Sequence, residues 1–150
     1  VNAKDLQAGK KLTLVKVDKK TGEKVLISSR TYKVSKDGTV TADTKDAGDY
    51  VLLNEKDAKA LSSKILKSVA LKDTKKTVAN GKKAKVTFDK NLNMENVKKI
   101  TYTSSKKSVV TVNKNGTIVA KKAGKAVVKV KVTLKNGKTK TVKMTIKVTK

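Results

Sequence analysis

The sequence predicts an all-β protein made of two small β-sandwich modules in tandem, joined by a short linker with helix-forming residues. Two observations support this prediction. Short runs in which apolar or threonine side chains alternate with polar ones recur along the chain, and glycine-containing turns separate them. The alternation stops between residues 54 and 67, and 150 residues are enough for two domains with thin cores.

The first module is expected over residues 1–53. Residues 11–17 (KLTLVKV) and 24–28 (KVLIS) alternate as strands do, and the polar residues between them are typical of a turn, which predicts a β-hairpin. Further short strands are expected on both sides of an Asp37-Gly38 turn. They are residues 31–34, 39–42 and 48–53.

The linker is expected over residues 54–67 (NEKDAKALSSKILK), which combine helix-tolerant residues with no β-type alternation. Asn54 is a residue type that commonly caps the start of a helix. The segment has neither glycine nor proline, so a short helix and a semi-rigid connection are expected.

The second module, residues 68–150, contains an ordered series of short motifs. They are Tyr102-Thr103-Ser104-Ser105, Val110-Thr111-Val112, Asn115-Gly116, Ile118-Val119-Ala120, Ala123-Gly124 and the alternating residues 126–132. This series resembles the bacterial Ig-like domain of group 2. The resemblance implies an Ig-like fold and a spacer, adhesive or binding module of a larger Gram-positive surface or secreted protein. Many members of that family have tryptophan where this chain has Tyr102, which implies a less firmly anchored core.

An internal similarity relates the two modules. Residues 34–42 (VSKDGTVTA) align with residues 112–120 (VNKNGTIVA), and Ala47-Gly48 then aligns with Ala123-Gly124. Four residues separate the two matched parts in the first copy and two residues separate them in the second. We therefore expect the first module to be a related Ig-like unit, although hairpins rich in lysine, glycine and threonine can also resemble one another by chance.

The last hairpin predicts its own register. A two-residue loop at Asn136-Gly137 would place Val130 opposite Lys143 and mix the apolar and polar faces. A three-residue loop over residues 135–137 instead places Val130 opposite Val142 and Val128 opposite Met144, which keeps one face apolar. The three-residue loop is therefore predicted.

This register sets lysines opposite one another on the outer face. The chain has 38 lysines and arginines against 12 acidic residues, for a net charge of +26, and residues 64–150 contain 25 basic residues and 3 acidic ones. Like charges placed directly opposite destabilise a sheet unless an anion lies nearby. The candidate polyanion-binding residues are therefore Lys125, Lys129, Lys143 and Lys147. In the alternative interpretation these lysines only solubilise the chain and discourage edge-to-edge pairing of sheets.

Composition argues against catalysis. The chain has no histidine and no cysteine, so the commonest general base and the thiolate nucleophile are absent. We expect no enzyme activity, no cofactor and no metal site, since the spacing of Asp43, Asp46 and Asp49 is not that of an EF-hand. One arginine and four aromatic residues argue against specific nucleic-acid recognition. No apolar run is long enough for a membrane span.

The leading hypothesis is a non-catalytic extracellular module, monomeric within a larger multidomain chain, that spaces or anchors a Gram-positive surface or secreted protein. Its lysines would bind an anionic cell-wall polymer or an acidic glycan. The absence of an initiating methionine and of a signal-peptide pattern indicates a fragment of that larger chain. Two alternatives remain. One is an adhesin that recognises a host surface receptor through loops 91–97 or 106–108, and the other is a purely mechanical stalk.

Overall fold

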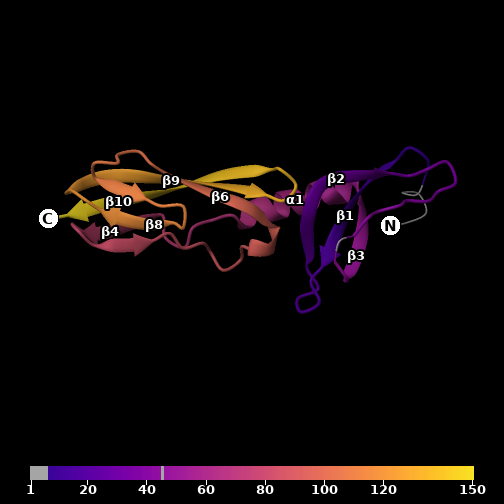
Figure 1. Cartoon of the computed structure of the whole chain (residues 1–150), viewed down its shortest axis with the longest axis horizontal. Helices are drawn as coiled ribbons and strands as arrows, with labels where there is room; N and C mark the ends of the chain where they lie inside the picture. Colours follow the sequence, from indigo (N-terminus) through magenta and orange to yellow (C-terminus); the bar gives the residue numbers. More distant parts are fainter. Residues whose placement is uncertain (1–6, 45) are drawn as a thin grey trace. The chain divides into compact units, whose positions relative to one another are not determined.

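The structure is a computed structural model that describes residues 7–44 and 46–150 (Figure 1). Strands dominate it, and the chain divides into two compact units. The first unit comprises the residues up to Ile65 together with Leu134–Lys138, and the second comprises Leu66–Thr133 and Thr139–Lys150. The all-β expectation is confirmed.

The first unit contains one antiparallel sheet. Its strands are β1 (Lys11–Val17), β2 (Lys24–Lys33) and β3 (Asp49–Asn54), in the order β2-β1-β3. The predicted hairpin is confirmed, but β2 runs five residues past its predicted end, because a register shift opposite β1 lets its last residues resume pairing. The described strands of this unit form one sheet and not two facing sheets. A sandwich fold for the first module therefore stays a prediction.

The turn of the first hairpin is held by an aspartate. The Asp18 carboxylate accepts hydrogen bonds from the backbone N–H groups of Lys20 (2.7 Å) and Thr21 (3.0 Å). These bonds, chiefly the one from Thr21, hold the pKa of Asp18 below its usual value, because they favour the charged carboxylate. The turn thus provides acceptors for these two backbone donors from within its own residues.

The internal similarity between the two modules extends to turn geometry. In the first copy the Ser35 N–H donates to the Thr39 carbonyl (3.0 Å), and in the second the Asn113 N–H donates to the Thr117 carbonyl (3.0 Å). Gly38 and Gly116 occupy the same position in the two turns, each with φ of 79°. After the turn, however, residues 117–120 form a strand and residues 39–42 do not. A common origin of the two units stays a prediction.

The predicted helix is present as α1 (Glu55–Ser68). The Asn54 side-chain oxygen accepts the Asp57 N–H at 2.8 Å, so Asn54 caps the helix as expected. Ile65 is the buried residue of α1, and the Ser62 hydroxyl accepts a 2.7 Å hydrogen bond from the Asn136 side-chain amide. Most of α1 therefore belongs to the first compact unit.

Replacing Asn54 by alanine should destabilise α1 by about 1 kcal/mol, because the helix loses the acceptor for one of its first N–H groups. Amide hydrogen exchange within α1 measures this as faster exchange near Asp57. Asn54→Asp, which retains the acceptor, should exchange as the unchanged chain does. Equal exchange in the alanine variant would show that the cap contributes nothing.

The second unit contains two sheets (Figure 1). The larger has the order β4-β10-β9-β6, with β4 (Lys75–Ala79), β10 (Thr139–Thr149), β9 (Gly124–Leu134) and β6 (Val97–Ser104). The smaller has the order β5-β8-β7, with β5 (Lys83–Lys85), β8 (Thr117–Ala120) and β7 (Val110–Val112). A short 3-10 helix, Met94–Asn96, precedes β6.

The core of the second unit lies between its sheets. Alternate residues of β9 and β10 are buried and meet the buried residues of β7 and β8. The fully buried members, each at most 3% exposed, are Val110, Ile118, Ala120, Ala126, Val128, Val130, Val132, Met144, Ile146 and Val148. The unit is therefore a β-sandwich whose thin core consists mainly of branched aliphatic side chains.

Candidate polyanion-binding face

The register of the last hairpin positions the candidate site. The Leu134 N–H donates to the Lys138 carbonyl (2.8 Å), and the Gly137 N–H donates to the Leu134 carbonyl (2.9 Å). Gly137 has φ of 84°, a conformation that glycine adopts without strain. The loop therefore has three residues, as predicted.

The two faces of the hairpin separate cleanly. Val130 lies opposite Val142 and Val128 opposite Met144 on the inner face. On the outer face Lys129 lies opposite Lys143 and Lys125 opposite Lys147, and all four lysines are exposed. The predicted register is confirmed, and it brings the four candidate residues together as two cross-strand pairs.

Strand β4 adds a further lysine to the same face. It pairs in parallel with β10, which places Lys75 beside Thr145 and Thr77 beside Lys147. We call the outward-facing residues in four successive rows across β4, β10 and β9 the lysine face. They are Lys75, Thr77, Thr141, Lys143, Thr145, Lys147, Lys125, Val127, Lys129 and Lys131.

Sequence reasoning missed two lysines of this face. Lys131 follows the same alternation as Lys125 and Lys129, so the outward pattern of the strand could have identified it. Lys75 could not be found in this way, because its position depends on the parallel pairing of β4 with β10, which joins segments about 70 residues apart.

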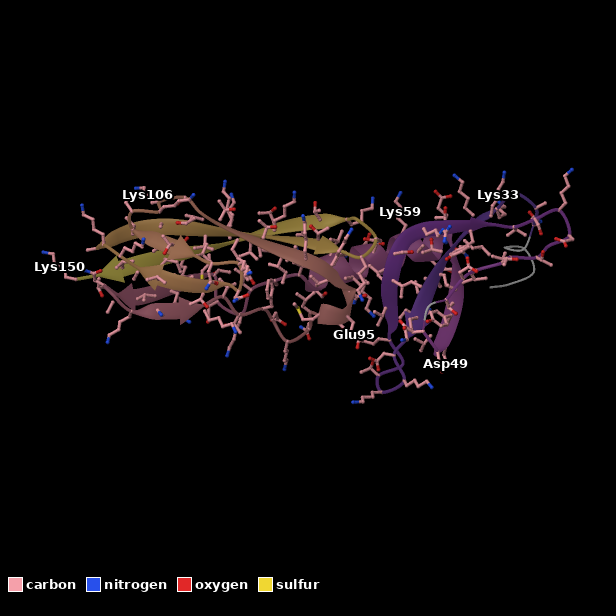
Figure 2. The ribbon with its side chains drawn as sticks, viewed as in Figure 1. Lys33, Asp49, Lys59, Glu95, Lys106 and Lys150 are labelled. Carbon is pink, nitrogen blue, oxygen red and sulfur yellow. The ribbon has the colours of Figure 1, made fainter. Side chains whose placement is uncertain are left out.

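The lysine face carries no compensating acid. The three acidic residues of the second unit are Asp73, Asp89 and Glu95, and none of them lies in a strand. Within the part of the chain that the structure describes, Lys125, Lys129, Lys143 and Lys147 form no ion pair with an acidic side chain. In Figure 2 other lysines of this unit, such as Lys106 and Lys150, also extend outward. The face is therefore a concentrated, unneutralised cationic surface.

Such a face can bind anions but supplies no catalytic group. Its side chains are lysine ammonium groups, threonine hydroxyls and one valine. The face contains no carboxylate that could act as a base. Among residues 7–44 and 46–150, no three His, Cys, Asp or Glu side chains gather where they could hold a metal ion. No helix in these same ranges is long and apolar enough to span a membrane.

The paired serines of the second module have structural roles. The Ser104 hydroxyl donates to the Val110 carbonyl at 2.7 Å and thereby links β6 of one sheet to β7 of the other. The Ser105 hydroxyl accepts the Val127 N–H at 2.9 Å, and its own N–H donates to the Val127 carbonyl at 2.9 Å. These hydroxyls are engaged in holding the sandwich together.

Loop 91–97, proposed for receptor recognition, is anchored on both sides of its middle residue. Leu92 is 7% exposed and Asn96 is 4% exposed, whereas Met94 between them is 51% exposed. The Asn93 side chain caps the 3-10 helix by accepting the Glu95 N–H at 3.0 Å. The loop thus presents one large apolar side chain, and a role in receptor recognition stays a prediction.

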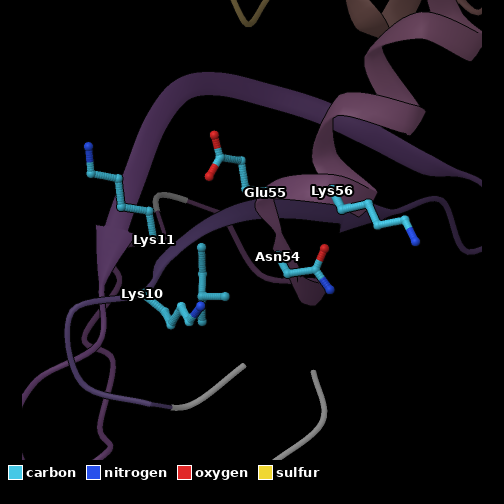
Figure 3. Close-up of a pocket in the computed structure, with 6 residues that line it drawn as sticks. Lys10, Lys11, Asn54, Glu55 and Lys56 are labelled. Atoms are coloured by element: carbon cyan, nitrogen blue, oxygen red, sulfur yellow. The ribbon is translucent and has the colours of Figure 1, made fainter. Parts of the chain in front are cut away.

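A separate pocket lies in the first unit (Figure 3). It has a volume of about 320 Å³. Its lining combines three lysines with one carboxylate: Lys10, Lys11, Leu12, Asn54, Glu55 and Lys56. Charges of both signs meet there, so this pocket is less cationic than the lysine face.

Two facing sheets, one of four strands and one of three, define the second unit as an Ig-like β-sandwich domain. The sequence profile of the family described as "Bacterial Ig-like domain (group 2)" matches residues 65–149. The chain therefore belongs to that family. The resemblance found in the sequence over residues 68–150 is confirmed.

Several solved structures with similarity to the chain are parts of the S-layer protein SbsC. Domains 5 and 6 of SbsC share 28% identity over 54% of this chain and 42% of that chain, with a TM-score of 0.41. Domains 4 and 5 share 21% identity over 79% of this chain and 66% of that one, with a TM-score of 0.43. The chain spans less than half the length of the first of these. No curated protein matches the sequence.

Proposed function

We propose that the chain is a non-catalytic module of a Gram-positive surface or secreted protein, which it spaces or anchors. In this proposal the lysine face holds an anionic cell-wall polymer or an acidic glycan. Membership of a bacterial Ig-like family supports the structural part of the proposal. The observation that carries the binding part is the pair of unneutralised cross-strand contacts, Lys129 with Lys143 and Lys125 with Lys147.

These pairs cost stability unless an anion is present. Like charges directly opposite in a sheet are destabilising by roughly 0.2–1 kcal/mol per pair. Salt screens this repulsion, and the flexible lysine stems can diverge. A polyanion does more than screen, because each of its charges can lie between two ammonium groups and release condensed counterions when it binds. Binding should therefore be strong in low salt and weaken steeply as salt rises.

The proposal is tested by binding of the full chain to intact Gram-positive walls, to walls stripped of teichoic acid, and to sulfated glycans, across a salt series. We expect saturable binding at physiological salt that decreases as the salt concentration rises. Loss of binding on stripping would identify the wall polymer as the ligand, and retained binding to sulfated glycans alone would identify an acidic glycan. If the chain binds none of the three saturably, the binding part of the proposal is wrong and the purely mechanical stalk becomes the favoured function.

Changing Lys125, Lys129, Lys143 and Lys147 together to glutamine should lower polyanion affinity by roughly tenfold or more, since each exposed ion contact contributes about 0.2–1 kcal/mol. Fluorescence anisotropy with a labelled polyanion measures the change. The variant should fold at least as stably as the unchanged chain, because the two repulsive pairs are gone.

The matched control removes the same charge elsewhere in the second unit. Lys83, Lys85, Lys106 and Lys122 are also exposed, and none belongs to the lysine face. Changing these four to glutamine should reduce affinity much less than changing the four on the face. If both variants lose affinity equally, net charge alone explains binding and the lysine face has no special role.

The adhesin alternative predicts that binding depends differently on salt and on single loop residues. Recognition of a receptor through the loop around Met94 would resist moderate salt and would be lost on Met94→Ala. Binding to a host surface that survives 0.5 M salt, at which charge interactions are screened within about 4–5 Å, would favour this alternative.

A further inference from the structure

The lysines of the face form a continuous track along the strands. Residues paired across strands share a row, and successive rows on one face are two residues apart. Four successive rows each contain at least one lysine. In order they hold Lys131 with Thr141, Lys129 with Lys143, Lys75 with Thr145 and Val127, and Lys125 with Lys147 and Thr77.

The spacing of these rows favours a linear ligand. Alternate residues in a strand lie about 6.6–6.8 Å apart, so the four rows extend over about 20 Å. A compact anion can reach two neighbouring rows at most. An extended polymer that lies along the strands and carries one negative charge about every 6–7 Å can meet a cation in each row.

The chemistry of the track indicates what kind of polymer this is. Threonine hydroxyls alternate with the lysines at Thr77, Thr141 and Thr145, and they can donate to phosphate oxygens beside the ammonium groups. No aromatic side chain belongs to the lysine face, so neither a nucleobase nor a sugar ring has a surface on which to stack. In a polyol chain with three carbons between phosphates, successive charges lie about as far apart as alternate residues of a strand.

We propose that the lysine face binds a linear phosphodiester-linked polyol along β9 and β10, with Lys131 extending the site one row beyond the two lysine pairs and Lys75 occupying the row between them. This inference rests on the proposed function, because it specifies the ligand of the same face. It adds a direction of binding, a length of about four phosphates for a ligand that occupies every row, and two contact residues.

The test uses the full chain and synthetic oligomers of 1,3-linked glycerol phosphate with two, four, six and ten phosphates. Affinity should rise by about tenfold or more between two and four phosphates, since the added charges bind at high effective concentration. Beyond four phosphates it should rise only in proportion to the number of possible binding positions. Isothermal titration calorimetry at one fixed salt concentration measures the series.

Variants in the two rows that hold a single lysine test whether the ligand lies along the track. Changing Lys75 and Lys131 together to glutamine should weaken binding of the six-phosphate oligomer about tenfold, because two rows lose their only lysine. The two-phosphate oligomer meets only two neighbouring rows and loses one of these contacts, so its binding should weaken only about threefold. The control pair, Lys83 and Lys122, lies outside the lysine face, and its change to glutamine should affect both oligomers little and equally. Equal effects of the two double variants would overturn the track.

Other ligands separate this inference from the proposed function. If inositol hexakisphosphate binds as tightly as the linear six-phosphate oligomer, the linear track is overturned although polyanion binding stands. If an oligothymidylate with six phosphates binds equally well, or only sulfated glycans bind, the polyol assignment is overturned. If no polyanion binds, both proposals fail.

Discussion

Replacing Ile146 by alanine should lower the free energy of unfolding of the second unit by about 2–5 kcal/mol. Ile146 is 0% exposed and lies in β10 between Ala126 of β9 and Lys76 of β4. Strands hydrogen-bonded on both sides cannot move inward to fill the space that the side chain leaves. Hydrogen exchange of peptides from β10, recorded across a denaturant series, measures the change as a shift in the midpoint of unfolding.

The adjacent residue is the natural control. Thr145 is exposed on the lysine face, so Thr145→Ala should change stability by no more than about 0.5 kcal/mol. Ile146→Val, which removes one methylene group, should cost about 0.5–1.5 kcal/mol. Equal losses at positions 145 and 146 would contradict the assignment of the two faces of β10, and with it the outward direction of Lys143 and Lys147.

The last hairpin could be predicted in full because two local rules agree. The apolar alternation of β9 and β10 defines which residues face inward, and Gly137 selects a loop with a left-handed residue. Only one loop length satisfies both rules. The positions of all four candidate lysines follow from that register, so this part of the site was accessible from the sequence.

Pairing between strands that are distant in the chain could not be predicted from the sequence in the same way. Strand β2 continues to Lys33 because a register shift opposite β1 absorbs the extra residues, and no local pattern marks that shift. Residues 39–42 resemble β8 in sequence, yet the structure assigns no strand to them. In the second unit β8 pairs with β5 on one side and β7 on the other. Sequence similarity therefore predicted the turn correctly, but a strand also needs partners.

In the candidate site, too, local patterns predicted some residues and long-range strand pairing determined the others. Lysines within the hairpin were placed by alternation, whereas Lys75 joins the face only through a parallel strand from a distant segment. A formal charge of +26 indicated a polyanion partner but could not indicate a direction of binding. The rows of the sheet supply that direction, because they order the charges along one axis.

Gly116→Ala should destabilise the second unit by about 2–5 kcal/mol, the sum of two separate costs. Gly116 has φ of 79°, where an L-residue pays about 1–2 kcal/mol. A Cβ atom at this position would also lie 2.8 Å from Cζ and 2.9 Å from the hydroxyl oxygen of Tyr102. The half-buried ring would have to tilt away, and such overpacking costs about 1–3 kcal/mol.

A double-mutant cycle separates these two costs. Gly81 has φ of 77° and nothing within 4 Å of the position of its added Cβ, so Gly81→Ala should show the backbone cost alone. In a Tyr102→Ala background the cost of Gly116→Ala should fall to the Gly81 value, because the ring is gone. This outcome would show that the aromatic residue and the Asn-Gly turn of the family motif are coupled by direct contact. An unchanged cost in that background would assign the whole effect of Gly116 to its backbone conformation.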